Sequence, residues 1–217
     1  MESGAEDTTV MQVPVGRPRQ AGYDRRILEA AVRVFACRGW ERFTFDAVAS
    51  EAGVGKPALY RRWSSRIELL RAATTQLVDQ TAVDHGSLRA DIEDYIRRFF
   101  NFMMTDSGRA WLRLQVELPF HSELQVISRS DLLHPAQIEF EGITSRAIER
   151  GELTCSPPVK LMLEAIGGPV VMRTIHTPPS ERAKLTLQEE AYVEELSNWT
   201  LRALAEFGRM SGEANSS

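Results

Sequence analysis

The side chains best suited to chemistry in this chain lie between residues 56 and 66. Lys56, Tyr60, Arg61, Arg62 and Arg66 bring four cations and one phenol hydroxyl into eleven residues. Cations and hydroxyls bind DNA phosphates, and an arginine can also form two hydrogen bonds with a guanine edge. The pattern therefore predicts a phosphate-binding surface, on which either Arg61 or Arg62 reads a base or pairs with the backbone.

Short helices must position these side chains. Thr44 is a natural N-cap for a helix that ends at Gly53, a left-handed terminator. Proline suits the first turn of a helix, so Pro57 begins the second helix and Lys56 lies at the N-terminus of that helix. Ser65 and Glu68, three residues apart, form a capping box for the third helix. This is the layout of a helix-turn-helix, and helical spacing predicts a core of Phe43, Phe45, Val48, Leu59, Trp63 and Leu70.

The first twenty residues offer a second, weaker signal. They are polar and interrupted by Pro14 and Pro18, so we expect residues 1–20 to be disordered. Within them, Arg17 and Arg19 flank a proline, and such a stretch can lie in the narrow minor groove of A·T-rich DNA. The alternative is a solvated linker.

The charge of the chain is unevenly distributed. The net charge is −4, but residues 17–71 carry +6 and the remainder −10. Phosphate binding is electrostatic, so this distribution favours contact with nucleic acid through one end of the molecule only.

Residues 23–72 resemble the TetR/AcrR family of transcriptional regulators. The resemblance rests on Ile27 to Ala31, Phe35, Gly39, Thr44, the block from Val48 to Lys56, the run from Leu59 to Trp63, and Ser65 with Arg66. It implies that Thr44, Gly55, Lys56, Pro57, Tyr60, Arg61 and Arg66 lie near DNA. The family often has a small residue in place of Pro57, which lacks a backbone N–H donor.

The rest of the chain is helical in pattern, without convincing strand alternation. We predict an all-α protein with a three-helix DNA-binding domain at residues 21–70. A helical regulatory and dimerisation domain follows at 71–208, and then a disordered tail at 209–217. Residues 157–176 are apolar nearly all round and must be buried in their own core or against a partner. The resemblance implies a homodimer through the helices at about 157–176 and 187–207, bound to a palindromic operator in double-stranded DNA.

Aromatic and methionine side chains in the regulatory part are candidates for a ligand cavity. Flexible methionines and flat rings suit a small apolar or aromatic ligand. The candidates are Phe99, Phe102, Met103, Trp111, Phe120 and Met172. The alternative for each is ordinary core packing.

Other classes of function have little support. The chain shows no membrane span and no signal peptide, so we expect a cytoplasmic protein. It has no metal-ligand spacing, nucleophile elbow or phosphate-binding glycine loop, so we expect no cofactor and no catalytic residues. An all-helical enzyme would need Glu93, Asp94, Glu117 and Glu123 to converge. We predict a dimeric repressor released from its operator by a ligand; the alternatives are a ligand-independent regulator and an architectural DNA-binding protein.

Overall fold

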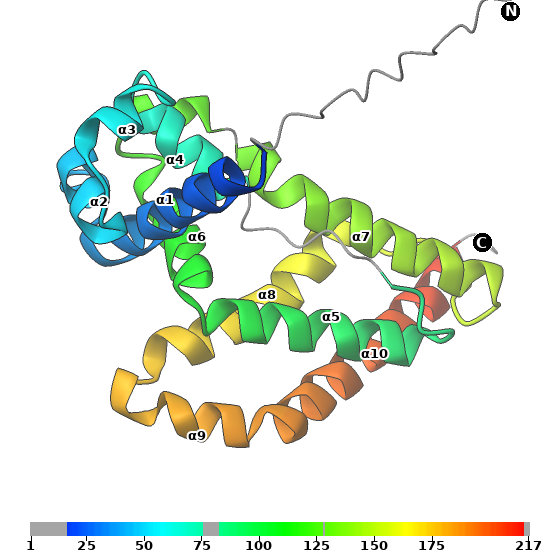
Figure 1. Cartoon of the computed structure of the whole chain (residues 1–217). Helices are drawn as coiled ribbons and strands as arrows, with labels where there is room; N and C mark the ends of the chain where they lie inside the picture. Colours follow the sequence, from blue (N-terminus) through cyan, green and yellow to red (C-terminus); the bar gives the residue numbers. More distant parts are fainter. Residues whose placement is uncertain (1–16, 76–82, 128, 215–217) are drawn as a thin grey trace, which may run out of the picture.

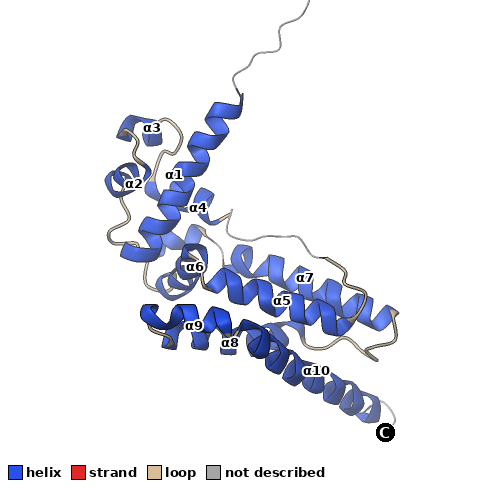
Figure 2. Cartoon of the chain, turned by 60° about the horizontal axis from the view of Figure 1, so that its bottom comes forward, coloured by secondary structure: helices blue, strands red, loops and turns tan. Residues whose placement is uncertain are grey.

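The computed structural model describes residues 17–75, 83–127 and 129–214. Within these ranges the chain forms α-helices and short 3-10 helices and no strands, which confirms the all-α prediction (Figures 1 and 2). Helices α1 to α4 gather at one end, and α5, α7, α8 and α10 form a bundle, with α6 between the two groups (Figure 1). No described helix combines the length and apolar character that crossing a membrane requires.

The N-terminal group consists of α1 (Arg17–Arg38), α2 (Phe45–Ala52), α3 (Lys56–Tyr60) and α4 (Arg66–Thr74). The Thr44 hydroxyl oxygen accepts from the backbone N–H of Ala47, and Gly53 ends α2 with a φ of 65°. The backbone N–H of Glu68 donates to the Ser65 hydroxyl at 3.3 Å, whereas the Glu68 carboxylate accepts from the N–H of Ser64. The predicted caps are therefore confirmed, except that the carboxylate of the capping box binds one residue earlier.

Both ends of the chain are more helical than we expected. Helix α1 begins at Arg17, so residues 17–20 belong to a helix, since Pro18 fits a first turn. Residues 1–16 of the predicted arm lie outside the described residues. Helix α10 (Glu189–Ala214) continues past Gly208, because one glycine costs a helix only about 1 kcal/mol and Arg209 pairs with Glu206 across it. Residues 215–217 are also outside the described part.

The regulatory group is built from longer helices. Its elements are α5 (Leu88–Met103), α6 (Asp106–Glu117), the 3-10 helix η1 (Ser122–Val126), α7 (Arg129–Glu149), α8 (Val159–His176), the 3-10 helix η2 (Pro179–Glu181), α9 (Arg182–Leu187) and α10. Ile92, Ile96 and Phe100 on α5 are fully buried in its core, together with Ile166 and Val170 on α8.

The core of the helix-turn-helix is completed by the regulatory group. Phe43, Phe45, Val48, Leu59 and Leu70 are buried as predicted, and Trp63 packs partly buried against them. Leu114 and Leu118 from the α6 region, and Leu124 and Ile127 from the η1 region, are buried in the same cluster. The core around α1 to α4 thus includes residues of both predicted domains, whereas the core of α5, α7, α8 and α10 is a separate cluster.

Candidate nucleic-acid interface

The N-terminal end of α2 lies beside α3 and forms one exposed face. Lys56 and Asp46 are joined by an ion pair of 2.6 Å between Nζ and Oδ2. The rings of Phe45 and Tyr60 meet edge to face, with centroids 4.7 Å apart. Phe45 is buried while Tyr60 is 62% exposed, so the Tyr60 ring contacts the core through Phe45 and most of the residue is open to solvent.

Six of the predicted DNA contacts are exposed around this face: Thr44, Gly55, Lys56, Pro57, Tyr60 and Arg61. We call this set the α3 face. Thr44 caps α2, Gly55 occupies the N-cap position of α3 and Pro57 lies in the first turn of α3. The set therefore combines a positive helix end with a lysine, an arginine and two hydroxyls, a composition that binds phosphates.

The ion pair with Asp46 keeps Lys56 in place in the free protein. The hydrogen bond to the Asp46 carboxylate raises the pKa of Lys56 above its ordinary value. Lys56 is consequently fully charged at neutral pH. Both side chains are more than half exposed, so water screens the pair and a phosphate can compete with Asp46 for the ammonium group.

Arg61 and Arg62 have different surroundings. Arg61 is exposed on the α3 face, whereas the Arg62 side chain is 22% exposed and forms an ion pair with Asp24 on α1. Arg62 also lies over the Tyr23 ring, 5.3 Å from its centroid, and donates to the Ala58 carbonyl. These contacts tie α3 to α1. We therefore leave Arg62 out of the proposed DNA contacts and keep Arg61.

Arg66 faces the regulatory group instead of open solvent. Its guanidinium stacks over the Trp40 ring, 3.9 Å from the centroid, and Nη1 donates to the Trp40 carbonyl. Nη2 donates to Glu123 Oε2 in η1 at 2.6 Å. This hydrogen bond holds the pKa of Glu123 below its ordinary value. Sequence reasoning missed these partners, because Trp40 and Glu123 are far from Arg66 along the chain.

A second carboxylate joins the same contact. The backbone N–H of Trp40 donates to Glu117 Oε2 at 2.8 Å, and the indole N–H donates to Glu123 at 3.0 Å. Gly39 has a φ of 69°, and a Cβ added there would lie 2.5 Å from Glu117 Oε1. Glycine is therefore favoured at position 39 by its left-handed conformation, and a larger residue there would also displace the Glu117 carboxylate. We call Trp40, Arg66, Glu117 and Glu123 the interdomain contact.

The structure brings together only some of the predicted ligand residues. Phe99, Phe102 and Trp111 form an aromatic cluster with centroid distances of 6.0 to 6.4 Å, and all three are partly buried. Met103 is buried in the core. Phe120 lies beyond the end of α6 at Glu117 and is 80% exposed, and Met172 on α8 is 48% exposed. We leave Phe120 and Met172 out of the proposed ligand contacts.

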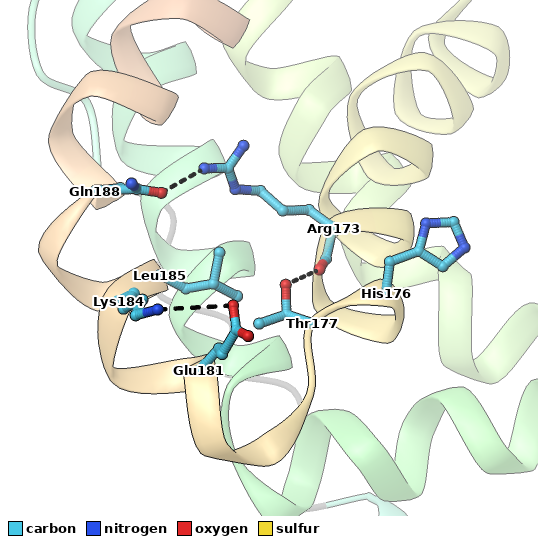
Figure 3. A pocket seen from close by; sticks show the side chains of 7 residues that line it. All are labelled: Arg173, His176, Thr177, Glu181, Lys184, Leu185 and Gln188. Atoms are coloured by element: carbon cyan, nitrogen blue, oxygen red, sulfur yellow. Dashed lines mark hydrogen bonds and ion pairs between the residues drawn. The ribbon is translucent and has the colours of Figure 1, made fainter.

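The described residues include a pocket that the sequence did not indicate. It has a volume of about 340 Å³ and lies between the end of α8, η2 and α9 (Figure 3). Its walls are formed by Arg173, His176, Thr177, Glu181, Lys184, Leu185 and Gln188. The available signal was the gathering of Arg173, His176 and Lys184 around Pro178 and Pro179. Among the residues that the structure describes, no three His, Cys, Asp or Glu side chains are grouped to hold a metal ion.

Comparisons with protein families agree with this architecture. The family model described as "Bacterial regulatory proteins, tetR family" matches residues 27–73. A second, "Tetracyclin repressor-like, C-terminal domain", matches residues 82–187. The regulator AqdR of Rhodococcus erythropolis is 30% identical over 160 residues, which cover 73% of this chain and 77% of AqdR. The uncharacterized regulator YdeS of Bacillus subtilis is 26% identical over 169 residues, covering 77% and 85%.

Solved structures share the fold at low sequence identity. A TetR family regulator from Marinobacter aquaeolei has a TM-score of 0.63 at 18% identity, covering 87% of this chain and 98% of the other. The regulator FadR from Bacillus subtilis, solved in complex with stearoyl-CoA, has a TM-score of 0.58 at 20% identity, covering 83% and 96%.

Proposed function

The chain belongs to the TetR family of bacterial regulatory proteins and is a DNA-binding transcriptional regulator, and we propose that it is a dimeric repressor of a palindromic operator. The α3 face carries this proposal. Lys56 and Tyr60 bind phosphates, while Arg61 reaches a base edge or a phosphate. Arg17 and Arg19 enter the adjacent minor groove; their side chains lie outside the described part.

Exposed apolar side chains on α8 and α10 support the dimer. Leu161, Met172 and Ile175 lie on one face of α8, each about half exposed, and Trp199 on α10 is 53% exposed. We call these four residues the apolar stripe. Such a stripe on two long helices suits burial against a second copy of the chain. A two-fold axis would place the two α3 helices about 34–36 Å apart, on successive turns of the major groove.

The ligand part of the proposal concerns the aromatic cluster and the interdomain contact. A small, largely apolar ligand beside Phe99, Phe102 and Trp111 would move α6, which carries Trp111. Glu117 at the end of α6 is bonded to Trp40, so the movement would change the position of the helix-turn-helix. The ligand would favour a dimer whose recognition helices have the wrong spacing for the operator. FadR, which shares the fold, was solved in complex with stearoyl-CoA, and the acyl chain of that molecule is apolar.

The proposal is tested by selecting genomic DNA fragments on the purified, full-length protein at physiological salt. We expect a few palindromic sites to be enriched, and we expect the protein to sediment as a dimer. Equal recovery of all fragments would indicate an architectural DNA-binding protein and overturn the repressor. A monomer that still enriches one site would overturn the dimer alone.

A further inference from the structure

The pocket between α8 and α9 has an excess of positive charge. Arg173 and Lys184 are cations in its wall, His176 adds a ring that can donate, and Glu181 is the one carboxylate among the lining residues. Glu181 is 4.0 Å from Lys184, and both side chains are more than half exposed. The pair is therefore loose and well solvated, and it leaves Lys184 available to a second anion.

Arg173 is held in a fixed orientation at this pocket. Its guanidinium stacks on the Tyr192 ring, 4.4 Å from the centroid, and Nη2 donates to Gln188 Oε1 at 3.1 Å (Figure 3). The Nε atom is buried and has no hydrogen-bond partner among the described residues. A guanidinium has five N–H donors in a planar fork, and a buried donor without a partner is destabilising. Because Nε is closed to solvent, a ligand in the pocket would bind the terminal Nη atoms of Arg173, of which Nη2 already donates to Gln188.

The end of a helix explains part of this charge. Arg173 and His176 lie in the last turn of α8, where cations stabilise the negative end of the helix dipole. Lys184 lies in the last turn of α9 and stabilises that helix end in the same way, while Gln188, which follows α9, holds Arg173 at the same hollow. The ends of two helices thus bring an arginine and a lysine to one hollow, where a single anion can contact both.

We propose that this pocket binds the anionic group of a small molecule, a carboxylate or a phosphate. Arg173 binds the anion through its fork and Lys184 provides the second charge. Leu185 in the wall is buried in the regulatory core, so an apolar portion of a few carbons can lie against it. A regulatory role for this site rests on the proposed function, because the bound anion would then be a signal to the repressor. Binding of the anion to the pocket does not depend on that function.

The test uses the full-length protein without DNA and two probes, sodium hexanoate and inorganic phosphate. Binding is measured by calorimetry at constant ionic strength, with hexanamide as the neutral counterpart of hexanoate. We expect one probe to bind, and Arg173→Gln to weaken it about tenfold or more, because the charged hydrogen bonds are lost. Stronger binding of hexanoate would indicate that the ligand is an apolar acid. Stronger binding of phosphate would indicate that the ligand carries a phosphate group.

A second variant separates binding from folding, because Arg173→Gln also removes the stacking on Tyr192. Gln188→Glu places a carboxylate where Arg173 already donates, so it should occupy the fork and abolish binding with the melting temperature retained. Lys160→Gln, at the other end of α8, is the matched control and should bind like the wild type. No binding of either probe up to about 10 mM, or equal binding by all variants, would overturn the site. Because no DNA is present, such a failure is distinct from a failure of the repressor, which the fragment selection tests.

Discussion

Arg66 in α4 and Glu123 in η1 are joined by a hydrogen bond of 2.6 Å, although they are 57 residues apart in the chain. The family resemblance places Arg66 beside DNA phosphates, whereas the free protein holds it on a carboxylate of the regulatory group. We propose that a DNA phosphate and Glu123 compete for the same guanidinium. DNA binding through Arg66 would loosen the interdomain contact, and a ligand that moves η1 would change how readily Arg66 is released.

Replacing Glu123 tests this competition. We predict that Glu123→Gln binds the operator about two- to fivefold more tightly, because a partly exposed ion pair contributes less than about 1 kcal/mol. Fluorescence anisotropy at constant salt measures the affinity. Glu141→Gln, an exposed glutamate on α7, is the matched control and should leave it unchanged. Weaker binding by Glu123→Gln would mean that Glu123 orients Arg66 for DNA instead of competing for it.

The phosphate contacts of the α3 face can be tested together. We predict that Lys56→Ala and Tyr60→Phe weaken binding to every DNA sequence, with the dimer and the fold intact. Lys56→Ala should also reduce the slope of log affinity against log salt by about one, since one phosphate contact is lost. Lys160→Ala removes an exposed lysine on α8 as a control. If Lys56→Ala binds its operator like the wild type, the orientation proposed for α3 is wrong.

Substitutions of the neighbouring Arg61 and Arg62 should have different effects, one on DNA binding and the other on the stability of the fold. We predict that Arg61→Ala weakens operator binding without changing the melting temperature. Arg62→Ala should instead lower the free energy of unfolding by about 1–2 kcal/mol, because the contacts with Asp24, Tyr23 and Ala58 are lost. Urea unfolding and anisotropy on both variants are the measurements. The opposite assignment, with a stable Arg62→Ala that fails to bind DNA, would return Arg62 to the interface.

Two glycines with the same backbone conformation provide a matched pair. Gly39 and Gly53 have φ values of 69° and 65°, but only at Gly39 would a Cβ meet another group, the Glu117 carboxylate. Gly53→Ala should cost about 1 kcal/mol from the conformation alone. Gly39→Ala should cost more and should displace Glu117 from Trp40. Equal losses of stability would show that the contact with Glu117 contributes nothing.

Local features of the helix-turn-helix could be predicted from the sequence. Thr44, Gly53 and Pro57 act within one helical turn, so residue type and spacing are sufficient to place them. The surroundings of Arg62 and Arg66 could not be predicted, because their partners come from α1 and η1. The pocket at Arg173 depends on how α9 folds back after Pro178 and Pro179, which helical periodicity does not specify. Phe120 and Met172 look like core residues by type, and only the packed structure shows them on the surface.

We propose that the α3 face recognises a particular DNA sequence. The most direct measurement is the affinity of the wild-type protein for a selected palindrome and for a shuffled duplex of the same composition, at physiological salt. We predict a difference of at least about 10³-fold, the range of specific regulators. Equal affinity for the two duplexes would contradict the account and leave a DNA-binding fold without an operator.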